Sequence, residues 1–174
     1  REPVKRLSPL AWVVVLFAAG LIGLVAYYFA FAGKQSEHLR EWLMQTKPWV
    51  AYLLPAIGLV TITLLRVRFF RGTEGTGIPQ TIAALQFEDE GERQKLLSPK
   101  ILFGKIILTT LGLCSGASMG REGPTVQAGA CIMYYCKRIL HVPQHLAQKG
   151  LIVAGGAAGI AAAFNAPVAG IVFS

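Results

Sequence analysis

Two short segments of the sequence combine glycine, proline and a polar side chain in a pattern that could hold a small anion. They read GTGIP at residues 75–79 and GREGP at residues 120–124. Glycine lets the backbone expose its N–H groups, and proline is favoured in the first turn of an α-helix. Each segment therefore predicts a loop that leads into a helix N-terminus, where unpaired N–H groups and the positive end of the helix dipole attract negative charge.

The first segment contributes one side-chain donor, the hydroxyl of Thr76. A tight turn between two membrane segments is the alternative interpretation of GTGIP. A nucleotide-binding loop fits poorly, because neither GxGxxG nor a following GKS or GKT is present and the surroundings are not a βαβ unit.

The second segment places an adjacent ion pair, Arg121 and Glu122, between two apolar runs. Charged groups at membrane depth are costly and indicate a function by default. The alternative is that the two charges neutralise each other where helices pack together. Gly123 and Pro124 begin the following helix, which places Glu122 at its N-terminal cap.

If the two helix N-termini converge, partial positive charge and backbone donors form an anion site that contains no full cation. Such a site suits conduction, since a fixed lysine or arginine would hold the anion too tightly. The carboxylate of Glu122 is itself an anion, which could fill the site when ionised and leave it when protonated. We therefore predict that Glu122 is both a gate and a proton carrier.

The composition is that of a membrane protein. Of the 174 residues, 53% are hydrophobic and only 15% are charged, whereas soluble domains carry about 25% charged residues. Five blocks contain no Asp, Glu, Lys or Arg, at residues 7–33, 48–65, 106–120, 123–136 and 150–174. Uncharged apolar runs of this length predict membrane spans, so an ordinary soluble enzyme and a disordered protein are excluded.

Two segments, residues 9–33 and 49–65, are long enough to cross the bilayer, and a polar segment of mixed charge at 34–47 joins them. After residue 74 the apolar segments are shorter and interrupted. We predict a short helix at 78–85, a surface loop at 87–100, a near-complete span at 101–120, a helix at 124–136, a connection at 141–149 and an apolar segment at 150–174 broken at Asn165 and Pro167.

Helix ends at membrane depth must be buried by protein or line a water-filled cavity, and transporters use them to hold ions. The small residues of segment 154–163, with Gly156 and Gly159, predict close helix packing.

The chain carries 17 basic and 9 acidic residues, a net charge of +8. Most basic residues lie at the ends of apolar runs, as in membrane proteins, and the stacking platform of a nucleic-acid binder is missing. We expect the lipid membrane as a partner and no nucleic acid. Residues 1–6 and 66–74 carry a larger basic excess than residues 34–47. This difference predicts that residues 1–6 and 66–74 lie on the cytoplasmic side and that residues 34–47 lie outside.

The cysteines and histidines show no metal-binding or redox pattern. They are Cys114, Cys131, Cys136, His38, His141 and His145. We predict buried, inert thiols and interfacial or surface histidines. Two further alternatives are a membrane-embedded enzyme that uses Glu122 as an acid or base, and a packing subunit. The apolar runs contain no second carboxylate or nucleophile–base pair to support an enzyme.

Three ordered motifs resemble the CLC family of chloride channels and proton-coupled chloride exchangers. They are GTGIP at 75–79, GREGPTVQ at 120–127 and GIAAAFNAPVAGIVF at 159–173. The resemblance implies an all-α integral membrane protein of tilted and broken helices, built as two inverted halves. Residues 1–174 would be the N-terminal half, from a chain truncated inside the transmembrane domain. It also implies a homodimer with one pore per subunit, multi-pass in the bacterial inner membrane.

The resemblance implies roles for particular residues. Thr76 lies at the central anion site, where family members usually carry a serine, and Glu122 matches the external gating and proton-transferring glutamate. The expected anion-binding residues are Thr76, Gly77, Ile78, Pro79, Gly120, Arg121 and Gly123. No metal or other cofactor is expected, and chloride is the transported ligand.

Some positions depart from the family pattern. Thr76 adds a methyl group to the usual hydroxyl, and fluoride-selective relatives also differ here. Gln80 stands where many members carry an acid. The inner proton-transfer glutamate of exchangers would lie shortly beyond Ser174. We predict transport of chloride coupled to proton antiport, with a voltage- or pH-gated passive chloride channel and a fluoride-selective exchanger as alternatives.

Overall fold

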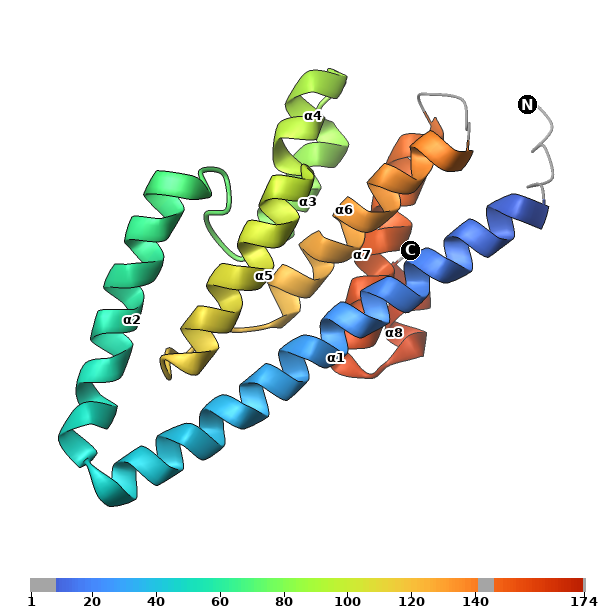
Figure 1. Cartoon of the computed structure of the whole chain (residues 1–174). Helices are drawn as coiled ribbons and strands as arrows, with labels where there is room; N and C mark the ends of the chain where they lie inside the picture. The colour runs from blue at the N-terminus through green and yellow to red at the C-terminus, as the bar shows by residue number, and fades with distance from the viewer. Residues whose placement is uncertain (1–8, 141–145, 174) are drawn as a thin grey trace.

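The computed structural model describes residues 9–140 and 146–173, and these residues form helices with no strand among them (Figure 1). The helices are α1 (Pro9–Thr46), α2 (Pro48–Phe69), α3 (Ile78–Gln86), α4 (Glu90–Leu96), α5 (Pro99–Cys114), α6 (Glu122–Leu140), α7 (Leu146–Phe164) and α8 (Pro167–Phe173). Residues 1–6, His141, His145 and Ser174, about which the sequence made predictions, lie outside the described residues.

Among the residues that the structure describes, three segments are long and apolar enough to cross a membrane, namely α1, α2 and the stretch from Glu90 to Cys114. Side chains such as Phe17, Tyr52 and Ile57 on α1 and α2 are exposed to the surroundings, as expected where lipid replaces water. The chain is therefore an all-α integral membrane protein, as the sequence predicted.

Helix α1 is longer than predicted. Its 38 residues would extend about 57 Å at about 1.5 Å per residue, nearly twice the thickness of the hydrocarbon layer. The polar segment 34–47 is not a separate connection, because α1 continues through it to Thr46. Good helix formers fill this segment, and Pro48 begins the next helix after the single non-helical residue Lys47.

The hydrophilic stretch 87–100 is not the predicted loop, because it contains α4 and the start of α5. The carboxylate of Asp89 caps α4 by accepting hydrogen bonds from the backbone N–H groups of Gly91 (3.2 Å) and Glu92 (3.3 Å). The hydroxyl of Ser98 accepts a hydrogen bond from the N–H of Ile101 (3.3 Å) at the start of α5. Both are ordinary N-cap signals, present in the sequence within a stretch dominated by charge.

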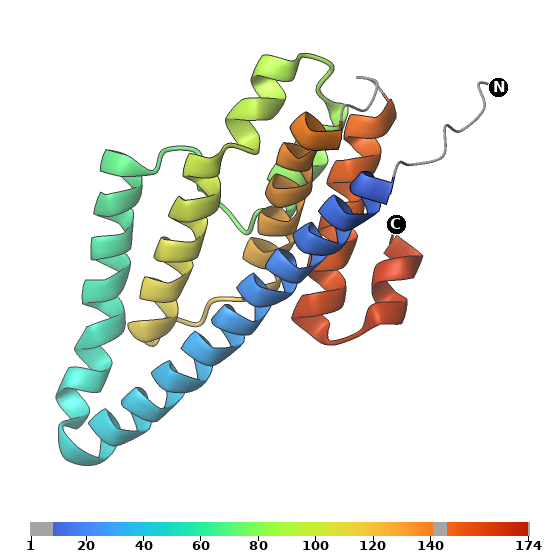
Figure 2. The same cartoon turned by 45° about the vertical axis from the view of Figure 1, so that its right-hand side comes forward.

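Helices α6 and α7 form the most extensive helix pair, and α1 crosses them at an angle (Figures 1 and 2). A Cβ atom added at Gly129 would collide with the backbone of Gly155. One added at Gly159 would lie 2.8 Å from the carbonyl oxygen of Thr125. The predicted close packing holds for Gly159, but Gly155 and not Gly156 is the second point of backbone contact.

The predicted break in the last apolar segment is confirmed. Helix α7 ends at Phe164, Asn165 has a φ of 51°, and α8 begins at Pro167. Asparagine tolerates the left-handed conformation better than most residues. The chain therefore turns sharply here, and α8 packs back on α7 (Figure 2).

Candidate functional site

The GTGIP segment leads into α3 through a glycine in the left-handed conformation. Gly77, with a φ of 106°, is the N-cap residue, and no side chain caps this helix end. The N–H and hydroxyl of Thr81 donate to the carbonyl oxygen of Gly77 at 3.0 and 2.9 Å. The N–H groups in the first turn of α3 have no partner within the helix and are available to a ligand.

The GREGP segment builds the start of α6 in the same way. The helix begins at Glu122, so this residue is the first of the helix and not, as predicted, the cap before it. The N–H and hydroxyl of Thr125 donate to the carbonyl oxygen of Arg121 at 3.2 and 2.7 Å. In both helices the fourth residue is a threonine that fixes the first turn, which leaves the preceding N–H groups unpaired.

The two turns lie in direct contact. A Cβ atom added at Gly123 would lie 2.5 Å from the carbonyl oxygen of Thr76 and 2.9 Å from its Cβ. One added at Gly77 would lie 2.9 Å from the carbonyl oxygen of Gly123 and 2.7 Å from Oε1 of Gln127. Glycine is required at both positions because any larger residue would push the turns apart. The N-termini of α3 and α6 therefore converge.

A cavity of about 380 Å³ lies beside this contact and takes its walls from both turns. We call it the turn cavity, and its polar lining includes Thr76, Gly75, Gly120, Ser118, Lys105 and Arg66. Two cationic side chains thus stand near the converging helix ends. The site contains more positive charge than the sequence predicted, because neither Lys105 nor Arg66 was among the expected residues.

Lys105 holds the first turn in place from α5. Its side chain is buried, with 4% of its surface exposed, and its ammonium donates to the carbonyl oxygens of Thr73 (2.9 Å), Glu74 (3.4 Å) and Gly75 (2.8 Å). These bonds turn the carbonyl dipoles of residues 73–75 towards Lys105. Lys105 is the single charged residue in the apolar stretch 101–114, and this was the signal that could have identified it, since intramembrane charges mark functional sites.

The first turn also carries a carboxylate, Glu74. A hydrogen bond with its own backbone N–H, with help from the Gly72 N–H and the charges of Arg66 and Lys105, lowers the pKa of Glu74 below its usual value. Glu74 is therefore an anion at neutral pH and offsets one of the two cations. The amide of Gln80 donates to the carbonyl oxygen of Glu74, so Gln80 braces the turn.

Glu122 and Arg121 point in different directions. A Cβ atom added at Gly120 would lie 2.7 Å from Oε2 of Glu122, so this carboxylate folds back over Gly120. A Cβ atom added at Gly33 of α1 would lie 3.8 Å from Nη1 of Arg121. No ion pair joins Arg121 to Glu122 within the described residues. The structure therefore gives no support to the alternative that the charges of Arg121 and Glu122 neutralise each other. The half-buried Glu122 carboxylate lies next to the contact between the turns.

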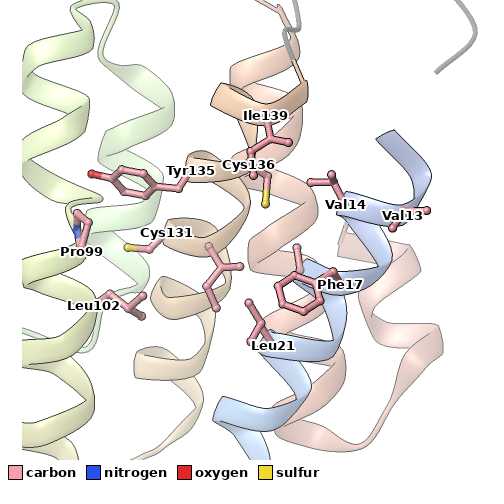
Figure 3. A pocket seen from close by; sticks show the side chains of 12 residues that line it. Val13, Val14, Phe17, Leu21, Pro99, Leu102, Cys131, Tyr135, Cys136 and Ile139 are labelled. Atoms are coloured by element: carbon pink, nitrogen blue, oxygen red, sulfur yellow. The ribbon is translucent and has the colours of Figure 1, made fainter. Parts of the chain in front are cut away.

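A larger cavity, of about 470 Å³, lies between α1, α5 and α6 and is almost entirely apolar. Figure 3 shows the side chains of Val14, Phe17, Leu102 and Cys131 that line it. It contains none of the predicted site residues. Cys131 is buried and Cys136 partly buried, as predicted, but Cys114 is exposed, which contradicts the prediction for that thiol. The residues that the structure describes hold no cluster of metal-binding side chains.

Comparison with known proteins identifies the family. Residues 56–174 match the family described as voltage gated chloride channel. The chain is 35% identical over 172 residues to the H(+)/Cl(-) exchange transporter ClcA of Vibrio vulnificus, a match that covers 92% of this chain and 36% of the relative. It is 36% identical over 173 residues to the protein of the same name from Cronobacter sakazakii, with the same coverage.

The chain therefore belongs to the CLC family of voltage gated chloride channels. The motifs that suggested this family, GTGIP and GREGP, both lie within the matched region. The chain spans about a third of the length of the curated relatives that it matches.

Proposed function

We propose that the complete protein exchanges chloride for protons across a membrane. The observation that carries this proposal is the contact between the Thr76 turn and Gly123, with the carboxylate of Glu122 folded over the adjacent Gly120. Two helix N-termini directed at one place favour an anion. A carboxylate beside that place can compete with the anion and carry a proton.

The proposed anion site uses backbone donors for the most part. Thr76, Gly77, Ile78 and Pro79 would hold the anion from the first turn, with the Thr76 hydroxyl as the side-chain donor. Gly120, Arg121 and Gly123 would hold it from the second turn. The guanidinium of Arg121 lies towards Gly33, so we assign its backbone to the site. Glu122 would block the outer position when ionised and open it when protonated.

The relatives support the choice of chloride and protons. The ClcA proteins of Vibrio vulnificus and Cronobacter sakazakii are named H(+)/Cl(-) exchange transporters. By analogy with these bacterial proteins, we assign the complete protein to the bacterial inner membrane. We also propose a homodimer with one pore in each subunit, as the family resemblance implies.

The test uses the complete protein in proteoliposomes with an imposed chloride gradient. Uphill proton movement driven by chloride would establish exchange. Chloride flux without proton movement would overturn the coupling and indicate a passive channel. Fluoride flux without chloride flux would overturn the choice of anion and direct attention to the extra methyl group of Thr76.

A further inference from the structure

A buried glutamine on α6, Gln127, joins three helices at the place where the two turns meet. Its side chain is 1% exposed, and it lies on the same helix as Glu122 and Gly123. Its amide nitrogen, Nε2, donates to the carbonyl oxygen of Leu96 at 3.2 Å, across 31 residues of sequence. Leu96 is the last residue of α4, so this bond fastens the end of α4 to α6. The function described above gives Gln127 no role.

The other end of the same amide faces the start of α3. A Cβ atom added at Gly77 would lie 2.7 Å from Oε1 of Gln127 and 2.8 Å from its Cβ. Gly77 is the N-cap residue of α3, so the glutamine side chain forms the surface against which this helix end rests. Because Nε2 donates to Leu96, the oxygen of the amide and not its nitrogen faces Gly77.

The oxygen Oε1 is an acceptor without a donor. It is buried and accepts no hydrogen bond from the residues that the structure describes. A buried polar atom of this kind costs free energy and is uncommon in folded proteins. A methionine would fill the same space without that cost, so packing alone does not account for Gln127. The positive end of the α3 dipole attracts the partial negative charge of Oε1, and this attraction draws the start of α3 towards α6.

The opposite end of α3 is fastened as well. Arg93 of α4 is buried, and its Nε donates to the carbonyl oxygen of Ala84 at 3.0 Å. Its guanidinium also donates to the carbonyl oxygen of Phe87, just beyond α3. Helices α3 and α4 are therefore joined at the end of α3. Gln127 thus contacts both the N-terminus of α3 and the helix that holds the C-terminus of α3.

We propose that Gln127 is a positioning residue of the anion site, which sets how far the N-terminus of α3 stands from that of α6. This inference rests on the proposed function, because it assumes that the backbone N–H groups of both helices hold chloride together. Gln127 acts through Gly77 and not by contact with the anion. It assigns to the glutamine a part in chloride affinity that is separate from the Glu122 gate.

The first test removes the amide. Gln127→Met keeps a flexible side chain of similar length but loses both polar ends. Calorimetry on the complete protein in detergent should show chloride affinity about threefold to tenfold lower, the effect of one lost hydrogen bond. The matched control is Gln86→Met at an exposed position of α3, which should leave chloride affinity unchanged. A lower melting temperature of Gln127→Met with unchanged chloride affinity would overturn the proposal, because the glutamine would then be structural alone.

Gln127→Glu supplies a second measurement, which loss of packing would not change. When protonated, the acid has nearly the shape of the amide, can donate to Leu96 and should bind chloride as the unaltered protein does. When ionised, it lacks that donor and places a full negative charge beside Gly77, so chloride affinity should fall by at least about tenfold. Calorimetry from about pH 5 to about pH 9 covers the range in which buried glutamates ionise. This variant carries the test if Gln127→Met does not fold.

The pH series is measured with Glu122→Gln present throughout, so that titration of the gate does not contribute. The parent for comparison is Glu122→Gln alone, in which every other titratable group near the turns is the same. Gln86→Glu in this parent is the control and should leave the pH profile unaltered.

The outcomes separate the two proposals. A pH profile for Gln127→Glu that matches its parent would refute the positioning role, and so would equal changes from Gln86→Glu and Gln127→Glu. Both results leave the proposed function intact if the unaltered protein binds chloride. Absence of chloride binding in the unaltered protein would refute the proposed function and the positioning role with it.

Discussion

Thr76 and Gly123 are separated by 46 residues of sequence, yet their backbones touch: a Cβ atom added at Gly123 would lie 2.5 Å from the carbonyl oxygen of Thr76. This contact joins the N-terminus of α3 to that of α6. It sets the distance between two groups of unpaired backbone donors, and we therefore expect anion binding to be sensitive to one added methyl group.

Gly123→Ala tests that expectation. The added methyl must displace the Thr76 turn, and overpacking of this kind costs about 1–3 kcal/mol. We expect chloride affinity, measured by calorimetry on the complete protein in detergent, to fall about tenfold or more, together with a lower melting temperature.

The control for Gly123→Ala is Gly156→Ala, also at a buried helical glycine. There the added Cβ would lie 3.7 Å from Cγ1 of Val126, an ordinary contact, so chloride affinity should not change. Equal losses of affinity in both variants would show that general destabilisation, and not separation of the turns, weakens binding.

Lys105→Met removes the ammonium that three carbonyl oxygens of residues 73–75 share. Thr73 is buried, and a buried carbonyl that is left unpaired costs about 1–3 kcal/mol. We expect a marked loss of thermal stability and weaker chloride binding, because the first turn loses its anchor on α5. Lys100→Met, at an exposed position of the same helix, should change stability by no more than about 0.5 kcal/mol. Unchanged chloride affinity in Lys105→Met would contradict a positioning role.

How much of this site could be predicted from the sequence depends on how far apart along the chain the interacting residues lie. Glycine and proline act locally, so the loop-to-helix turns at GTGIP and GREGP could be identified from the residues alone. The bond from Lys105 to Thr73 spans 32 residues of sequence, and nothing in the local pattern indicates which carbonyls this lysine meets.

The errors in the fold that was predicted from the sequence have a related cause. Residues 34–46 and 90–96 are polar, and polarity alone predicted connections, although their helix formers and the Asp89 cap favour helix. The direction of the Arg121 guanidinium towards Gly33 depends on how α1 crosses α6. No property of the GREGP segment itself contains that information.

Thr76 provides a test of anion choice. Thr76→Ser removes the methyl group and keeps the hydroxyl donor, whereas Thr76→Val keeps the shape and removes the donor. If the hydroxyl holds the anion, Thr76→Ser should retain chloride transport and Thr76→Val should weaken chloride binding by about tenfold, the effect of one lost hydrogen bond of about 1.4 kcal/mol. Relative chloride and fluoride fluxes in proteoliposomes measure the outcome. Chloride binding by Thr76→Val as strong as that of the unaltered protein would show that the Thr76 hydroxyl does not hold the anion.

Glu122→Gln separates gating from packing at the start of α6. The amide has nearly the shape of the carboxylate and can still lie over Gly120, but it cannot carry a proton or compete as an anion. We expect proton movement driven by a chloride gradient to disappear while chloride flux continues, with little change in melting temperature because the side chain forms no ion pair within the described residues. Simultaneous pH and chloride-electrode recordings from proteoliposomes give both fluxes.

The control is Glu92→Gln, which removes an exposed carboxylate paired with Lys95 on α4 and should leave the ratio of the two fluxes unchanged. Proton coupling that survives in Glu122→Gln would place the proton carrier elsewhere in the protein and leave Glu122 a part of the anion site alone.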